Sequence, residues 1–204
     1  MGEIQYALSV YEYLINYKYK FVISHRKTVY YLELTFNEKD FLHIAGLHYL
    51  SDIDIPRTPK ILFHKIKNNK IDDEYLAKSV YYLQIKDSYA KVKNRIYALK
   101  FLERFLDNKN LICKYVKYKN IYSNINADYL IKSTVDHMTA YIFFKNRNVK
   151  NNTYCICSFF LETDSKYNGV NVYWLYKSKV NLDSGEEFIL YDRLDDEIKK
   201  LYAI

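Results

Sequence analysis

The chain has 204 residues, of which 50% are hydrophobic and 18% aromatic, including 24 Tyr. This composition can build a core and excludes a disordered chain, which would have few aromatic residues. The net charge is +7, from 31 Lys and Arg against 24 Asp and Glu. A basic surface favours a polyanionic partner, although heavy use of Lys, Asn, Tyr and Ile is also what an AT-rich genome produces.

No apolar stretch approaches the roughly 18 residues that a membrane-spanning helix needs. The N-terminus also lacks the basic and apolar segments of a signal peptide. The three cysteines, Cys113, Cys155 and Cys157, match no common zinc-site spacing. We therefore expect a soluble, reduced protein of the cytoplasm, with no metal or other cofactor.

The first 36 residues predict a helix followed by a β-hairpin. Apolar residues recur at helical spacing from Ile4 to Tyr17. Residues 17–24 and 28–36 are rich in β-branched and aromatic residues, and the polar turn 24–27 separates them. Two such runs joined by a short polar turn are typical of a hairpin.

Residues 57 to 108 predict several helices, beginning after the helix-breaking Pro56. The first helix is expected at 60–67. A second should follow an N-cap at Asp72 or Asp73, with Leu76, Val80 and Leu83 on one face. A third should run from an N-cap at Asp87 or Ser88 to Leu106. The last helix carries a basic side formed by Lys91, Lys93, Arg95, Lys100 and Arg104. Such a side is either a solvated surface or a nucleic-acid contact.

After Asn108 the pattern predicts an antiparallel sheet of about five strands. They are expected at 111–118, 127–133, 139–145, 153–162 and 170–180, and the last 20 residues predict a further strand and a helix. The chain is thus predicted to be α+β, with an N-terminal helix and hairpin, several helices, and then the sheet. We expect one domain over residues 1–204 with a helical insert at about 57–108.

The segment Phe36–Asp52 places His43 and His48 in an otherwise apolar run. Asn37 is suited to N-cap a helix that begins at Glu38 and carries both histidines inward. Five residues apart in a helix, the two side chains would lie roughly 140° apart around its axis, so they could not bind one metal ion. Each is either a packed core residue or an acid–base group facing a cleft. Gly46 between them indicates the close approach of another backbone or a substrate.

The pattern L-x-F-x-x-x-x-F-x-H-x-x-G-L-H-x-L-x-D, formed by Leu34 to Asp52, resembles the signature of a nuclease-toxin family associated with phages and Firmicutes. That family is grouped with barnase, EndoU, cytotoxic colicins and RelE. The segments ADYLIKS, TAYIFFK and CICSFFLE, followed by Tyr167, are similar to its sheet strands. Tyr49 stands where the family pattern has a basic residue. The resemblance covers, with gaps, about residues 32–180, and it implies a barnase/EndoU/colicin/RelE-like fold.

The resemblance implies a metal-independent endoribonuclease acting as a toxin or phage-conflict effector. In such enzymes the RNA 2′-hydroxyl attacks the adjacent phosphorus, so the protein must supply a base, an acid and cations. On this basis the expected catalytic residues are His48 and His43, with Lys145 and Arg147 as cations and Ser158 as a phosphate donor, and the expected RNA-binding residues are Lys132, Tyr167 and Lys177. The expected partners are RNA, with tRNA as one candidate, and a cognate inhibitor or antitoxin.

Two other hypotheses stay open. A non-catalytic module of the same fold would bind nucleic acid or a protein, and its nucleic-acid binding would be salt-sensitive without turnover. A structural or regulatory phage protein would instead keep both histidines in its core. Under either alternative, Lys132 and Lys145 are simply solvated ends of strands.

Overall fold

The computed structural model describes residues 1–80, 86–162 and 166–202, without the side chains of residues 86–91, 201 and 202. Its helices and helical turns are α1 (Glu3–Ile15), α2 (Glu38–Ile44), η1 (Leu47–Tyr49), α3 (Pro59–Lys67), α4 (Asp73–Leu76), α6 (Lys86–Leu99), α7 (Leu102–Asp107), η2 (Lys117–Lys119), η3 (Val149–Asn151) and α8 (Asp196–Tyr202). Its strands are β1 (Tyr17–His25), β2 (Thr28–Thr35), β3 (Leu111–Tyr115), β4 (Tyr129–Val135), β5 (Met138–Asn148), β6 (Thr153–Leu161), β7 (Gly169–Asn171), β8 (Tyr173–Asn181) and β9 (Glu187–Asp192).

The predicted mixed α+β composition is confirmed, but the sheet is larger than the predicted five strands. One sheet of nine strands runs in the order β7-β3-β4-β5-β6-β2-β1-β8-β9. The N-terminal hairpin therefore lies inside the sheet rather than beside it. It joins through a short parallel register between β2 and β6, in which Glu33 pairs with Thr153 and Leu34 with Tyr154.

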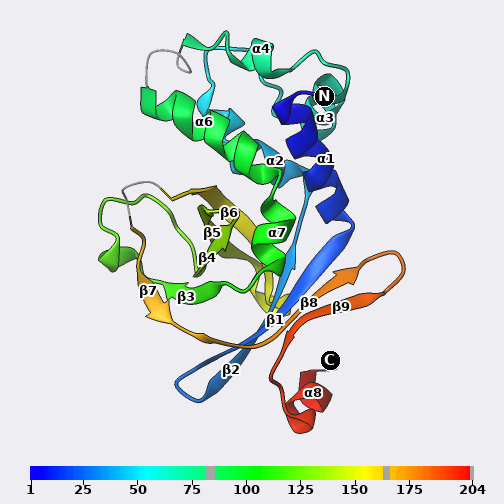
Figure 1. Cartoon of the computed structure of the whole chain (residues 1–204), viewed down its shortest axis with the longest axis vertical. Helices are drawn as coiled ribbons and strands as arrows, with labels where there is room; N and C mark the ends of the chain where they lie inside the picture. The colour runs from blue at the N-terminus through cyan, green and yellow to red at the C-terminus, as the bar shows by residue number, and fades with distance from the viewer. Residues whose placement is uncertain (81–85, 163–165, 203–204) are drawn as a thin grey trace.

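The sheet is curled, and the stretch that was predicted as one strand over 170–180 bends at Val172. Its first part, β7, pairs with β3, whereas its second part, β8, pairs with β1. One continuous stretch of chain therefore reaches two strands that are far apart in the sheet order. This bend brings the β3 side of the sheet toward the β8 side (Figure 1).

The helices α1, α2, α3, α4 and α6 gather at one end of the sheet, and α8 lies at the other end (Figure 1). The inner face of α1 is buried as its apolar spacing predicted, with Ile4, Leu8 and Leu14 at most 1% exposed. The helix predicted to reach Leu106 is interrupted after Leu99. It restarts as α7, which directs Phe105 against Phe159 of β6 at 6.2 Å between ring centroids.

The helix predicted after Asp72 is correctly capped but short. The Asp72 carboxylate accepts from the main-chain N–H of Tyr75, and α4 ends at Leu76. Val80, predicted on its apolar face, is 50% exposed. Leu83 lies outside the described residues. No helix in the described part of the chain is both long and apolar enough to span a membrane.

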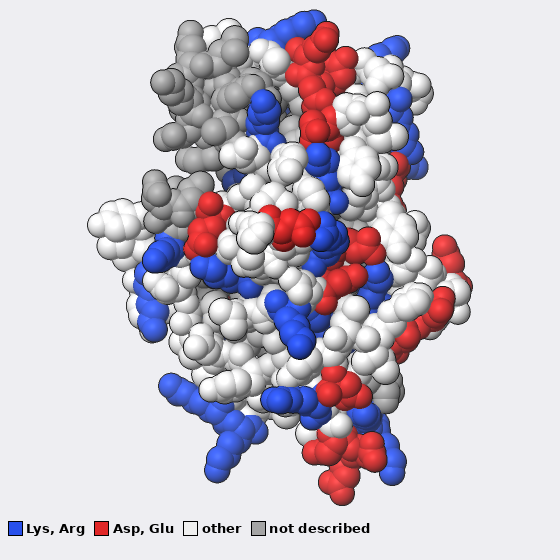
Figure 2. Space-filling model, in the orientation of Figure 1, with Lys and Arg blue, Asp and Glu red and all other residues white. Residues whose placement is uncertain are grey.

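A second, smaller hydrophobic cluster covers another part of β3, β4, β5 and β6. It consists of Tyr115, Leu130, Tyr141 and Phe143, with Phe160 and Tyr167 packed against it. On the face shown in Figure 2, Lys and Arg side chains are interspersed with Asp and Glu. The net positive charge is therefore spread over this face rather than collected in one patch.

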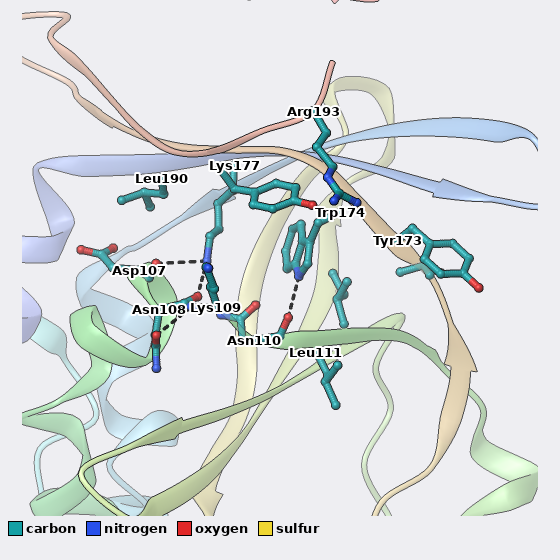
Figure 3. A pocket seen from close by; sticks show the side chains of 13 residues that line it. Asp107, Asn108, Lys109, Asn110, Leu111, Tyr173, Trp174, Lys177, Leu190 and Arg193 are labelled. Carbon is teal, nitrogen blue, oxygen red and sulfur yellow. Dashed lines mark hydrogen bonds between the residues drawn. The ribbon is translucent and has the colours of Figure 1, made fainter. Parts of the chain in front are cut away.

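Lys177 lies at the seam where the curled sheet brings β8 near the end of α7. Its side chain is 3% exposed, and its ammonium donates to the main-chain carbonyl of Leu106 at 2.8 Å. It also donates to the carbonyls of Asp107 and Asn108 at 3.3 and 2.6 Å (Figure 3). Burial lowers the pKa of Lys177 to about 8, so it is still mainly protonated at pH 7. Trp174 Nε1 donates to Asn110 O at 2.9 Å across the same seam. The two residues line a cavity of about 320 Å³.

We expect Lys177→Met to lower the free energy of unfolding by about 2 kcal/mol, because it leaves the carbonyls at the end of α7 without their donor. Urea unfolding of the purified variant measures this loss. The matched control is Lys145→Met on β5, where the lysine is exposed and the expected change is within about 0.5 kcal/mol. Equal stability of the two variants would contradict the capping role.

Candidate active site

The histidine segment begins as predicted. Asn37 is the N-cap of α2, and its side chain accepts from the main-chain N–H of Lys39 at 3.2 Å. Phe36 and Phe41, on either side of the first turn, are buried and both pack on the ring of Tyr11. The N-terminal end of α2 is therefore fastened to the helical layer.

The other end of α2 differs from the prediction. The helix stops at Ile44, and Gly46 adopts the left-handed region with φ +77°. Its main-chain N–H donates to His43 O at 3.1 Å, and the chain then turns through η1. Gly is favoured here because a left-handed residue just past a helix end carries no Cβ penalty.

This turn brings the two histidines together instead of holding them about 140° apart. The ring centroids of His43 and His48 are 4.6 Å apart. Both residues are exposed, so the prediction that the helix carries them inward is wrong. Buried Leu47 and Leu50 anchor the turn, and this leaves His48 on its outer side.

The surroundings of His48 favour its neutral form. Partial burial of the ring lowers its pKa below the ordinary 6.5, and the positive fields of His43 and Arg95 act in the same direction. Its Nδ1 lies 3.4 Å from Leu42 O, a contact that opposes this shift. A carbonyl only accepts, so the contact places the proton on Nδ1 and leaves the lone pair on Nε2. That tautomer is able to take a proton from a hydroxyl group.

Arg95 of α6 is a buried cation beside this histidine pair. It is 7% exposed, and its guanidinium carbon lies 5.3 Å from the Tyr49 ring centroid and 5.4 Å from that of Phe160. Its Nε is buried with no hydrogen-bond partner among the described residues. Burial lowers the pKa of Arg95, but an arginine remains charged at neutral pH. The site therefore holds a positive charge that can attract an anion.

Gly46 and Arg95 are in close contact. A Cβ added at Gly46 would lie 3.1 Å from Cδ of Arg95 and 3.6 Å from a ring carbon of Tyr49. The missing side chain thus leaves room for the arginine stem as well as permitting the turn. This agrees with the close approach that Gly46 indicated in the sequence, but the neighbour is a side chain of the protein itself.

Lys132, Tyr141 and Phe160 form a row across β4, β5 and β6 beside Arg95. The register pairs Lys132 with Tyr141 and Tyr141 with Phe160. Glu162 accepts from Lys132 Nζ at 2.6 Å and from Tyr141 Oη at 2.5 Å. Tyr167 packs edge-on against Phe160 at 5.4 Å. Lys132 and Tyr167 are therefore joined to the Arg95 region through one aromatic cluster.

Arg147 lies near the start of α2, where it forms an ion pair with Asp40. Burial raises the pKa of Asp40, and the attraction of Arg147 opposes that shift. The neighbours of Arg147 on β5 pair with Tyr154 and Thr153, at the start of β6. Phe160 lies near the other end of β6. At about 3.3 Å per residue, roughly 20 Å of strand separates the two ends. The geometry gives Arg147 a role in holding α2 against the sheet.

The remaining predicted residues are less closely tied to the histidines. Lys145 is exposed on β5, and Ser158 is half-buried on β6 opposite Phe143. Lys177 lies on β8, separated from β6 by β2 and β1 in the sheet order, and its N–H groups are used by the three carbonyls of the seam. No group of three potential metal ligands is present among the described residues.

Arg95 and Phe160 were not among the predicted site residues. Arg95 was assigned to the basic side of its helix, yet it lies three residues after Val92 and four before Leu99, both buried. This spacing places it at the border of the apolar face and could have singled it out.

In this α+β fold, two adjacent imidazoles and a buried guanidinium form a site suited to acid–base chemistry on an anionic substrate. Residues 3–194 match the family model of the phage-Barnase-EndoU-ColicinE5/D-RelE like nuclease 4 (PBECR4), so the chain belongs to this nuclease family. The resemblance inferred from Leu34–Asp52 is thereby confirmed. Searches of curated proteins and of solved structures gave no match.

We expect Gly46→Ala to be more destabilising than Gly185→Ala. Both glycines have positive φ, +77° and +73°, so each alanine variant bears a backbone cost of about 1–2 kcal/mol. Only at Gly46 does the added Cβ crowd a buried side chain, which adds about 1–3 kcal/mol. At Gly185 nothing lies within 4 Å of the added atom. Urea unfolding of the two variants tests this difference, and equal losses would contradict the packing of Arg95 against Gly46.

We expect NMR titration to give His48 a pKa below 6.5 and His43→Asn to raise it, because a neighbouring positive charge is removed. The matched control is His137→Asn, which changes an exposed histidine in the β4–β5 turn and should leave His48 unaffected. Near pH 6 the unfolded chain binds more protons at this site than the folded one. The contribution of His48 to stability is therefore present above pH 6.5 and is lost as the pH falls. A His48 pKa above 6.5 would contradict this description of the site.

Proposed function

We propose that the chain is a metal-independent endoribonuclease that cleaves RNA by transesterification through the 2′-hydroxyl. The observation that carries the proposal is the contact of the His43 and His48 rings, 4.6 Å apart, beside the buried cation Arg95. Membership of a nuclease family makes a phosphodiester the substrate bond. The choice of RNA rests on the chemistry that two imidazoles can perform without further help.

In the proposed mechanism His48 is the general base. Nε2 of its neutral ring takes the proton of the 2′-hydroxyl as that oxygen attacks the adjacent phosphorus. His43 donates a proton to the departing 5′-oxygen. The products are a 2′,3′-cyclic phosphate and a free 5′-hydroxyl, so atoms and charge balance without water in this step. The attacking and departing oxygens belong to one phosphodiester but lie on opposite sides of its phosphorus, so in this mechanism each ring serves a different oxygen.

Arg95 supplies the positive charge in this mechanism. A cation fixed in a partly water-excluded site stabilises the extra negative charge of the phosphorane without first having to reorient. Its Nε is buried without a partner, which favours this role over a purely structural one, since buried donors are usually satisfied. We retain Lys145 and Ser158 as candidate phosphate ligands and Lys132 and Tyr167 as candidate RNA contacts, and we assign Arg147 to positioning α2.

The proposed setting is that of a toxin or phage-conflict effector that acts on RNA in the cytoplasm. Transfer RNA is one candidate target, and a cognate inhibitor or antitoxin is the partner that such an activity calls for. The net charge of +7 favours association with RNA through its phosphates.

We expect the purified protein to cleave total RNA in EDTA and to leave 2′,3′-cyclic phosphate ends. His48→Ala and His43→Ala should each reduce the cleavage rate by about 100-fold or more, because each removes a proton-transfer group. Gel analysis and mapping of the RNA ends measure both effects. The control variants His64→Ala and His137→Ala change exposed histidines outside the site and should cleave normally.

Full activity of a folded His43→Ala, His48→Ala double variant would show that the assigned mechanism is wrong. Salt-sensitive RNA binding by the wild-type protein without cleavage would instead identify a non-catalytic binding module of the same fold.

A further inference from the structure

The loop after β3 exposes three large apolar side chains. Tyr118, Ile121 and Tyr122 are 77, 73 and 98% exposed. Further along the loop, Ile125 and Ala127 pack against the second hydrophobic cluster on β3 to β6. The loop thus covers the sheet with one part and presents aromatic rings to solvent with the other. A group of exposed apolar side chains of this kind usually marks an interaction site.

This loop is fastened to the chain next to Tyr167. Asn120 is buried, and its Nδ2 donates to Val116 O at 2.8 Å and to Asn168 O at 2.7 Å. The main-chain N–H of Asn168 donates back to Asn120 Oδ1 at 3.0 Å. The exposed tyrosines therefore stand on a loop with a defined attachment, which lowers the entropy lost when a ligand binds.

Between Asp107 and Asp128 the loop carries positive charge only. Residues 108–127 include four Lys and neither Asp nor Glu. Lys114, Lys117 and Lys119 are exposed, and none of the three forms an ion pair with a residue that the structure describes. Basic side chains are visible over the η2 side of the molecule in Figure 2. These charges are therefore free to meet an anion.

A chain of contacts connects this loop with the histidine pair. Tyr167, adjacent to the Asn120 attachment, packs on Phe160 at 5.4 Å. Phe160 lies under Arg95, and Arg95 in turn lies over the Tyr49 ring that contacts His48 at 4.0 Å. The loop and the histidine pair are therefore joined by one continuous set of packed side chains.

We propose that the segment 117–122 is a binding platform for the single-stranded part of the RNA substrate. Tyr118 and Tyr122 stack on unpaired bases, and Lys117 and Lys119 contact the adjoining phosphates. Exposed aromatic rings alternating with lysines are the features that bind single strands with little sequence preference. A protein partner is less favoured, because lysine is depleted at protein–protein interfaces. The proposal rests on the assignment of RNA cleavage to the histidine pair.

The test measures RNA binding in a His48→Ala background, so that cleavage does not consume the probe. The probe is a fluorescently labelled single-stranded RNA, and the comparison probe is the same strand annealed to its complement. We expect Tyr118→Ala, Tyr122→Ala to weaken single-strand binding by about 10- to 100-fold, since base stacking on an aromatic side chain has a large effect when removed. Tyr173→Ala, which removes a tyrosine that is 70% exposed elsewhere, is the matched control and should bind normally.

A second pair of variants tests the charges. Lys117→Ala, Lys119→Ala should reduce the slope of log affinity against log salt by about 1.4, because two phosphate contacts are lost at about 0.7 each. Lys60→Ala, Lys150→Ala removes two exposed lysines elsewhere and should leave the slope unchanged. Unfolding curves of all variants should match that of the parent, because the altered side chains are exposed.

The two proposals fail separately. Normal RNA cleavage together with unchanged binding by the tyrosine variant would overturn the platform and leave the nuclease mechanism standing. Tyrosine-dependent binding of single-stranded RNA by a wild-type protein that does not cleave would overturn the mechanism and support the platform. Equal loss of binding to the duplex probe would also overturn it, because stacking needs unpaired bases.

Discussion

Gly46 has a φ of +77°, and a right-handed helix cannot continue through that dihedral. The site depends on this constraint. If α2 continued, His48 would lie on a different side of the helix from His43, and one of the two would face the core. Because the chain turns instead, both imidazoles reach the surface together, and the space left by the missing Cβ is occupied by the stem of Arg95. One residue thus brings the two imidazoles together and leaves room for the stem of Arg95.

Arg95 and Lys177 are both buried cations, but their surroundings differ. Lys177 donates to three carbonyls at the end of α7, where the helix dipole is negative, so its charge is satisfied within the fold. Arg95 lies between two aromatic rings with an unsatisfied Nε and has no carboxylate partner in the described part of the chain. Burying a charge there costs desolvation free energy, and the contacts of Arg95 within the fold offset only part of that cost. A buried cation whose hydrogen-bonding groups are not all satisfied is suited to binding an anion.

Local signals in the sequence predicted the elements well. The N-cap at Asn37, the hairpin after Tyr17 and the strand series after Asn108 follow from short-range chemistry, and all appear in the structure. The family pattern over Leu34–Asp52 also led to the correct family. The end of α2 differs from the prediction because Gly46, which helical spacing places inside the helix, terminates it.

The remaining differences come from long-range packing. The bend at Val172, which assigns one stretch of chain to two distant strands, has no local signature beyond ordinary strand residues. Likewise, the burial of Arg95 is decided by Tyr49 and Phe160, which come from other parts of the chain. Helical spacing could indicate that Arg95 borders an apolar face, but not which rings would cover it.

The pairing of β1 with β8 has a consequence for how the protein folds. Its paired residues are about 150 to 160 positions apart in the chain, and β1 is an interior strand of the sheet. One edge of β1 therefore stays open until β8 has been synthesised, and closing so long a loop is slow. The sheet can be completed only after residues 173–192 have left the ribosome. The strands that hold the two ends of the sheet together are therefore among the last of the described strands to form their pairs.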